Sequence, residues 1–294
     1  MGKILVTGAS GDIGRKTLLH LLKLKPADQL IGLARDPSKA ADLAAKGIEV
    51  RQGDYFDRDS LLRAFKGVEK VMLTSTHAFT DRKTAHANVI DVAVEAGVRH
   101  LVYMAIFRKK NSTVSMKEIT QEDIFTEQKL LSSGLNYTIA YHPPFLDVLA
   151  FYIGPKAQET GVRVPAGERK FNAATRDDLA AGHAAILAGQ GHENRTYALT
   201  GDPAISFSDI AVILSKLTGT KVPFVKISDE EYLAAIGQSI PANIAQFVLE
   251  WVHNMGDGEW EEQTKDLESL IGRKATTPTE FFRDGYLPKE SFES

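Results

Sequence analysis

Near its amino end the chain reads Lys3-Ile4-Leu5-Val6-Thr7-Gly8-Ala9-Ser10-Gly11-Asp12-Ile13-Gly14, an apolar run followed by three glycines spaced three residues apart. The apolar run is typical of a buried parallel strand. Gly8 permits a tight turn, Gly11 lets the backbone approach a pyrophosphate, and Gly14 lets the next helix pack closely on the strand. The first amides of that helix would face an anion. The stretch therefore predicts a strand, a turn and a helix that bind a dinucleotide.

The residues that follow support this interpretation. Leucines recur from Leu18 to Leu24 at the spacing of an amphipathic helix, and a second apolar strand is predicted at Leu30–Ala34. The alternative is an ordinary strand, turn and helix whose glycines serve packing only. The spacing Gly-x-x-Gly-x-x-Gly, rather than the commoner Gly-x-Gly-x-x-Gly, resembles that of the short-chain dehydrogenase/reductase superfamily.

The end of the second strand decides which dinucleotide is bound. Arg35 comes directly after the strand and could accept a 2′-phosphate, whereas an acidic residue there would hold the ribose 2′-hydroxyl. Asp36 comes next, so both signals are present. Asp36 could instead cap the helix that starts at Pro37, and Arg35 could be only a surface charge. Because Arg35 lies nearer the expected position, and Ser10 could add a hydroxyl to a phosphate, NADP(H) is favoured over NAD(H).

Strands and helices alternate through the first half of the chain. After residue 34 the predicted elements are strands at 48–51, 71–75, 100–104 and 137–141, and helices at 59–65, 83–96 and 120–132. This alternation predicts an α/β protein with a Rossmann-type, doubly wound parallel sheet. Such sheets bind ligands beyond the carboxyl ends of their strands, so the functional residues should follow each strand directly.

The alternation loosens after about residue 150. We expect residues 1–150 to form an NAD(P)-binding domain, to which about 168–205 return. About 151–167 and 206–294 should form a smaller α/β substrate lobe over the cofactor cleft. The elements predicted in this half are a helix at 179–188, a strand at 195–199, a helix at 207–217, an extended segment at 222–227 and a helix from 228.

Composition narrows the function classes. The 294 residues carry a net charge of −3, which argues against a basic nucleic-acid surface. There is no cysteine, and so no disulfide or thiol nucleophile. The eight histidines lack metal-ligand spacing, and no metal is predicted. The first strand begins within three residues, which leaves no room for a signal peptide, and no apolar run reaches membrane-spanning length. A cytoplasmic protein, with a homodimer left open, is expected.

Further motifs extend over almost the whole chain. They include Ile31-Gly32-Leu33-Ala34-Arg35, Val50-Arg51-Gln52-Gly53-Asp54-Tyr55, Ala174-Thr175-Arg176-Asp177-Asp178 and Gly191-His192-Glu193-Asn194-Arg195-Thr196-Tyr197. Together with the glycine turn they resemble the NmrA-like branch of the atypical short-chain dehydrogenases, especially its bacterial NADPH:quinone oxidoreductases and triphenylmethane-dye reductases. The resemblance implies that Asp54 lies near the adenine and that Thr74–Thr76 follow the ribose and pyrophosphate. The predicted cofactor-binding residues are Gly8, Ser10, Gly11, Asp12, Ile13, Gly14, Arg35, Asp54, Thr74, Ser75, Thr76 and Tyr141.

The chain departs from ordinary short-chain dehydrogenases at the catalytic positions. The resemblance places a serine, a tyrosine and a lysine where this chain has Ala105, Asp123 and Glu127. Without that triad, dehydrogenation of simple alcohols is not expected. A quinone or a cationic dye is electrophilic enough to accept hydride directly from a well-positioned nicotinamide.

Two candidate proton donors remain for such a reaction. Asp123 and Glu127 are spaced i, i+4, so their mutual repulsion could let one of them hold a proton. His142 follows the sixth strand and could titrate near neutrality. The alternatives are that the two acids form a solvated helix face, and that His142 only shapes the loop before Pro143. Asp123 and His142 are therefore the predicted catalytic residues.

The acceptor site is less defined by the sequence. An apolar slot for a flat ring could be lined by Phe107, Phe145, Phe151, Tyr152 and Trp251, with Arg108-Lys109-Lys110 at its mouth, although these aromatics could equally be core. The predicted function is an NAD(P)H-dependent oxidoreductase that reduces a quinone, dye or similar conjugated electrophile. The alternative is a non-catalytic NAD(P)-binding redox sensor that acts through a protein partner, as some NmrA-like proteins do.

Overall fold

The computed structural model describes residues 2–109, 112 and 116–288, and its centre is a sheet of seven parallel strands. The strands lie in the order β3-β2-β1-β4-β5-β6-β8, so the chain leaves β1 in one direction and β4 in the other. This confirms the predicted Rossmann-type, doubly wound sheet. The strands are β1 Lys3–Thr7, β2 Leu30–Ala34, β3 Glu49–Gln52, β4 Val68–Leu73, β5 His100–Ile106, β6 Asn136–His142 and β8 Arg195–Ala198.

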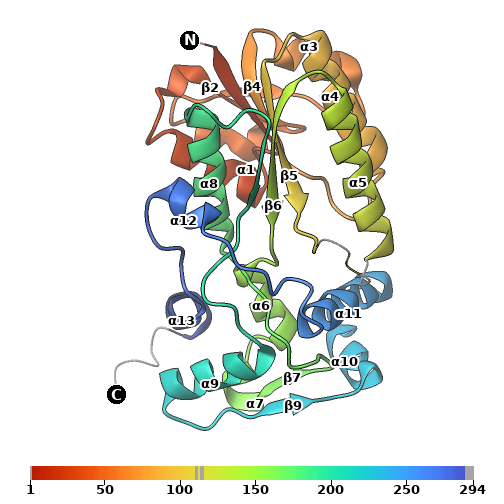
Figure 1. Ribbon diagram of the computed structural model, residues 1–294, viewed down its shortest axis with the longest axis vertical. Coiled ribbons are helices and arrows are strands. Elements are labelled where there is room, and N and C mark those ends of the chain that lie inside the picture. The colour runs from red at the N-terminus through yellow and green to blue at the C-terminus, as the bar shows by residue number, and fades with distance from the viewer. Residues whose placement is uncertain (1, 110–111, 113–115, 289–294) are drawn as a thin grey trace.

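Helices cover both faces of this sheet (Figure 1). On one face α1 (Asp12–Leu21) packs against α8 (Arg176–Ala188). On the other face α3 (Arg58–Phe65), α4 (Arg82–Glu95) and α5 (Lys117–Ser132) follow one another. Short helical segments complete the domain: η1 Ala27–Gln29, η2 Pro37–Ala40 and α2 Ala41–Ala44.

The central strands are apolar throughout because both faces of the sheet are covered. β1 contributes Ile4 and Val6 to the core under α1 and α8, and it contributes Leu5 to the core under α3 and α4. Side-chain caps fix where several helices start: Asp81 accepts from the Thr84 amide at the start of α4. Local sequence and long-range burial therefore specify the same boundaries.

The remaining elements form a smaller lobe below the sheet (Figure 1). Its own core is continuous and apolar. In the figure the arrowheads of β5 and β6 point toward this lobe, so the carboxyl ends of the strands face it. Its elements are α6 Leu146–Ile153, α7 Ala157–Thr160, β7 Val162–Val164, α9 Phe207–Thr218, β9 Phe224–Lys226, α10 Asp229–Ile236, α11 Ala242–Gly256, α13 Pro278–Phe281 and η3 Phe282–Tyr286.

Two segments of the second half lie against the large domain. β8 pairs with β6 in parallel, and α12 (Asp266–Ile271) packs on α8. The extended segment predicted at 222–227 is shorter, and it pairs with β7, which the sequence did not predict. How the chain divides into two domains stays a prediction. No helix within residues 2–109, 112 and 116–288 is both long and apolar enough to cross a membrane.

Candidate cofactor cleft and acceptor pocket

The glycine turn after β1 has the geometry that its sequence predicts. Gly8 has φ +66°, and its carbonyl accepts from the Gly11 amide at 2.9 Å. A Cβ on Gly14 would lie 2.4 Å from the Gly8 oxygen, so only glycine lets α1 start this close to the strand. Gly11 is the N-cap of α1, and no side chain caps the helix. The amides at its start therefore lack a side-chain acceptor and fit an anionic group such as a pyrophosphate.

The ends of β1 and β4 are joined beneath this turn. The Thr74 amide donates to Thr7 Oγ1 at 2.9 Å, and the Thr74 hydroxyl donates to the Thr7 carbonyl at 2.9 Å. Tyr55 donates to the Thr74 carbonyl at 2.9 Å, and the Ser75 hydroxyl donates to the Met104 carbonyl at 2.6 Å. Because these hydroxyls hold the protein together, the loop after β4 offers a cofactor mainly its backbone.

Arg35 and Asp36 have different roles at the end of β2. Asp36 is the N-cap of η2, and its carboxylate accepts from the Ser38 amide at 3.0 Å. The hydrogen bonds from Ser38 lower the pKa of Asp36. Arg35 is exposed and has no ion pair among the described residues. Its guanidinium can therefore accept a 2′-phosphate, whereas the Asp36 carboxylate is already occupied.

Asp54 lies beside Arg35 because β2 and β3 end in register. The Gly53 amide donates to the Ala34 carbonyl at 3.1 Å, and Asp54 accepts from the Phe56 amide at 2.9 Å. The carboxylate of Asp54 is partly exposed. The place of Asp54 near the adenine, which the resemblance implies, stays a prediction.

A charged cluster that the sequence analysis missed joins three helix starts. Asp12 begins α1 and pairs with Lys16 at 3.0 Å and with Arg176 at 3.0 Å. Arg176 begins α8 and lies 3.7 Å from Asp147 in the first turn of α6. The cluster places a guanidinium next to the glycine turn, where it would offset the negative charge of a pyrophosphate.

Asp123 is not a solvated acid, as one alternative had it, nor is it paired with Glu127. It is fully buried and forms an ion pair with Arg82, which is itself buried. It also accepts from the Tyr103 hydroxyl at 2.8 Å and from the Ile106 amide at 2.8 Å. Arg82 in turn donates to the Thr76 carbonyl at 3.1 Å. The Asp123 carboxylate thus connects the loops after β4 and β5, and both of its oxygens already accept hydrogen bonds.

Glu127 forms an ion pair with a different arginine, Arg108. Arg108 pairs with Glu127 at 2.8 Å and lies 5.8 Å above the Tyr141 ring. The Tyr141 hydroxyl donates to Glu127 at 3.1 Å. Burial, followed by the negative charge of Glu127, raises the pKa of Tyr141 to about 12. The expected sharing of a proton between Asp123 and Glu127 is therefore wrong, because each carboxylate is neutralised by a separate arginine.

His142 does not titrate near neutrality, contrary to the expectation. It ends β6 with its side chain buried, and its Nε2 lies 2.7 Å from Nε2 of His183 in α8. Burial and then His183 lower the pKa of His142 well below its ordinary value. The neighbouring Phe145 packs edge-on against the His142 ring at 5.9 Å. His142 therefore faces the core under α8 as a neutral ring.

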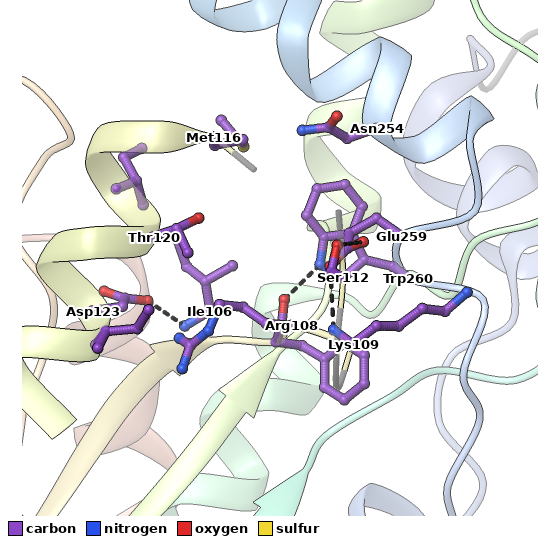
Figure 2. A pocket seen from close by; sticks show the side chains of 13 residues that line it. Ile106, Arg108, Lys109, Ser112, Met116, Thr120, Asp123, Asn254, Glu259 and Trp260 are labelled. Carbon is purple, nitrogen blue, oxygen red and sulfur yellow. Dashed lines mark hydrogen bonds between the residues drawn. The ribbon is translucent and has the colours of Figure 1, made fainter. Parts of the chain in front are cut away.

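A pocket of about 210 Å³ opens at the carboxyl end of β5, between α5 and the end of α11 (Figure 2). Its lining residues are Ile106, Phe107, Arg108, Lys109, Ser112, Met116, Ile119, Thr120, Asp123, Ile124, Asn254, Glu259 and Trp260. Of the predicted aromatics only Phe107 lines this pocket. Lys110 lies outside the described residues.

The other predicted aromatics lie elsewhere. Trp251 stacks on Trp260 with ring centroids 4.7 Å apart and planes 9° apart, so it supports the pocket wall from behind. Phe151 and Tyr152 pack on each other in α6, where Phe151 is 42% exposed. They miss the pocket because the apolar face of α6 joins the core of the smaller lobe.

Comparison with known proteins gives the same architecture. The model of the NmrA-like family matches residues 1–287. This chain belongs to the NmrA-like family. It is 35% identical to quinone oxidoreductase 2 of Escherichia coli over 94% of this chain and 96% of that protein. It is 30% identical to an NAD(P)H azoreductase of Xenophilus azovorans over 95% and 96%.

Solved structures agree with this NmrA-like assignment. An NADPH-dependent quinone oxidoreductase from Escherichia coli, crystallised with NADPH, superposes with a TM-score of 0.87 at 34% identity and covers 94% of this chain and 97% of its own. Triphenylmethane reductase of Citrobacter sp., crystallised with NADP(H), superposes with a TM-score of 0.88 at 31% identity and covers 97% and 100%. The family resemblance inferred from the motifs is confirmed.

Several residues of this NmrA-like site could not be predicted from local sequence. No local sequence pattern marks Arg82 as a site residue, because it lies 41 positions before its partner Asp123. Asn254, Glu259 and Trp260 were also missed, although they form the wall of the pocket opposite α5. For the segment Gly256-Asp257-Gly258-Glu259 the sequence predicts only a turn. The turn brings Trp260 back to the β5 loop, where its indole donates to the Phe107 carbonyl at 2.9 Å.

Proposed function

We propose that this NmrA-like protein is an NADPH-dependent reductase of quinones, dyes or similar conjugated electrophiles. The observation that carries the proposal is the pocket at the carboxyl end of β5, on the same edge of the sheet as the glycine turn and Arg35. The relatives named above, which are quinone and dye reductases, support the reaction type. Arg35, free of ion pairs among the described residues, supports NADPH over NADH.

The cofactor-binding residues proposed from the sequence keep their roles, and Arg176 joins them. When bound, NADPH supplies one hydride to the acceptor, and with one proton from solvent a quinone becomes a hydroquinone. The start of α1 binds the pyrophosphate through its amides. Arg176 offsets the charge of that pyrophosphate, and Arg35 holds the 2′-phosphate. The loops after β1 and β4 orient the cofactor through their backbone.

The chain's acids act in positioning rather than as proton donors. Asp123 fixes the Ile106 amide and, through Arg82, the Thr76 carbonyl, so it sets the spacing of the two loops that border the pocket. His142 stabilises the carboxyl end of β6 from the buried side. Because the pocket carboxylates are all held by donors, water delivers the proton after hydride transfer. A quinol oxygen is basic enough to take this proton from water after the hydride has been transferred.

The test is NADPH oxidation by the purified protein, measured with menadione, with malachite green and without an acceptor, and repeated with NADH. Acceptor-dependent oxidation that prefers NADPH supports the proposal. Saturable NADPH binding with no oxidation by any acceptor contradicts it and favours a redox sensor. A cytoplasmic location and a homodimer stay predictions, to be checked by cell fractionation and by light scattering.

A further inference from the structure

Asn254 places at the pocket wall a side-chain amide that bonds no described residue. It lies in the last turn of α11 with 8% of its surface exposed, and it lines the pocket. Its backbone carbonyl accepts from the Glu259 amide at 3.0 Å, but its side chain has no hydrogen-bond partner within the described part of the chain. Figure 2 shows the amide over the space between Met116 and Trp260. Because this amide borders the open pocket and bonds no described residue, it is available to a ligand atom there.

The charged groups of the pocket are all engaged. Asp123 is neutralised by Arg82, and Arg108 is neutralised by Glu127. Glu259 accepts from the Lys109 amide at 3.1 Å and from the Ser112 hydroxyl at 2.5 Å. The Lys109 ammonium donates to the Gly258 carbonyl. A strongly cationic or anionic acceptor would therefore find no free counter-charge among the lining residues described.

The rest of the wall is apolar and small. Met116, Ile119, Phe107 and Trp260 provide most of the contact surface, with the indole of Trp260 held by its bond to the Phe107 carbonyl. The volume of about 210 Å³ lies below the range of ~300–1,000 Å³ that drug-sized ligands occupy. The pocket suits one or two fused rings better than the three separate rings of a triarylmethane dye.

A second neutral polar group faces the pocket from the opposite side. Thr120 lies in the first turn of α5, and no described residue bonds to its hydroxyl, whereas its amide donates to the Met116 carbonyl at 3.1 Å. Figure 2 shows Thr120 on the α5 wall, with Asn254 on the α11 wall. Two neutral donors on opposite walls match a flat ring with an oxygen at each end.

We propose that the Asn254 side-chain N–H donates to a carbonyl oxygen of a small neutral quinone, with the Thr120 hydroxyl bonding the second oxygen. This assignment rests on the proposed reductase function and names its acceptor class. In the reaction one hydride and one proton convert the quinone to a hydroquinone, and the bond from Asn254 strengthens as negative charge develops on the oxygen. Asn254 is thus a substrate-binding residue that selects quinones over cationic dyes.

The test compares Asn254→Leu with the wild type, using menadione and malachite green as acceptors. We expect kcat/KM for menadione to fall about tenfold or more, since a bond to developing charge is lost. The rate with malachite green should be unchanged, because that dye has no carbonyl. Gln246→Leu, on an exposed position of the same helix, is the matched control and should alter neither rate. NADPH affinity should be equal in all three proteins.

Asn254→Asp is the second variant, nearly identical in shape, and it covers the case that the leucine variant does not fold. Its carboxylate cannot donate, so menadione reduction should fall and malachite green reduction should rise. Equal losses with both acceptors, or no loss with menadione in either variant, would overturn the assignment while leaving the reductase function intact. A wild-type protein that binds NADPH but reduces neither acceptor would overturn both.

Discussion

The Nε2 atoms of His142 and His183 lie 2.7 Å apart in the core between β6 and α8. One ring must donate and the other accept, and because burial lowers the pKa of both rings, they are neutral and hold complementary tautomers. The Nδ1 atoms of both rings are buried without a partner in the described residues. Such a pair ties the end of β6 to α8 only as long as neither ring gains a second proton.

Stability should therefore fall as the pH falls below neutrality. Burial lowers the pKa of His183 to about 3, against an ordinary value of 6.5, and burial followed by the charge of His183 lowers the pKa of His142 well below that ordinary value. Below pH 6.5 the unfolded chain takes up protons on these rings and the folded chain does not. The contribution of these two rings to the free energy of unfolding is therefore fully present above pH 6.5 and is lost progressively as the pH falls below it. The loss between pH 7 and pH 5 should be about 2 kcal/mol per histidine.

Urea unfolding at the two pH values checks this expectation. In His183→Leu the loss between pH 7 and pH 5 should be smaller than in the wild type by about 2 kcal/mol. The exposed His77→Leu serves as control, and its loss should match that of the wild type. An equal loss in His183→Leu and the wild type would contradict the burial argument.

Arg35→Ala should weaken NADPH binding by roughly 10- to 100-fold and leave NADH binding unchanged, because only NADPH carries the 2′-phosphate. Titration of the two cofactors by fluorescence measures both constants. Arg58→Ala is a suitable control, since Arg58 lies on α3 and pairs with Glu95 at 3.2 Å, away from the glycine turn. Equal weakening for both cofactors would show that Arg35 does not read the phosphate.

Alanine substitutions at the two glycines beside the start of α1 should have different effects, one on stability and the other on NADPH binding. Gly14→Ala places a Cβ 2.4 Å from the Gly8 oxygen, so the free energy of unfolding should drop by about 2 kcal/mol or more. In Gly11→Ala the added Cβ lies 3.3 Å from the same oxygen, so the protein should fold with little loss of stability. Its methyl group should nevertheless weaken the binding of NADPH. Thermal unfolding and NADPH titration on both variants separate the effects. A stable Gly14→Ala protein would disprove the packing requirement.

Asp123→Asn should destabilise the fold by about 1.5–3 kcal/mol, because the buried Arg82 loses one of its two carboxylate partners and keeps only Glu122 at 3.3 Å. Glu127→Gln should cost less, since its partner Arg108 is partly exposed. Urea unfolding gives both values. The double variant Arg82→Met with Asp123→Leu should regain only part of the stability, because the Tyr103 hydroxyl and the Ile106 amide lose their acceptor.

Activity of the same variants tests the positioning role of Asp123. If Asp123 supplied the proton, the kcat of Asp123→Asn would fall with a changed pH profile. We expect instead that KM for the acceptor rises along with the loss of stability, because the loops after β4 and β5 move apart. A normal free energy of unfolding with an abolished kcat would contradict this account.

Local sequence was sufficient for the sheet and for the glycine turn after β1. The glycine turn, the apolar strands and the position of Arg35 depend on neighbours within a few residues, and each was predicted. The conflict between Arg35 and Asp36 was also open to local reasoning. In the structure Asp36 caps η2 by accepting from Ser38, as one of the two alternatives had it.

The pocket depends on contacts that no local pattern contains. The spacing of Asp123 and Glu127 correctly put both on one helix, but their partners come from α4 and from the loop after β5. The burial of His142 depends on His183, 41 residues later. Asn254 reaches the pocket only because α11 of the second lobe lies across the end of β5. Such long-range pairings are set by tertiary packing and leave no periodic signal.

The stacked pair Trp251 and Trp260 gives the protein a built-in optical probe. The chain has only two tryptophans, and both belong to this pair behind and within the pocket wall. All indole emission therefore originates within a few ångströms of the acceptor. A flat, electron-poor ring entering the pocket should quench it. Occupancy can then be followed in unlabelled protein, separately from turnover.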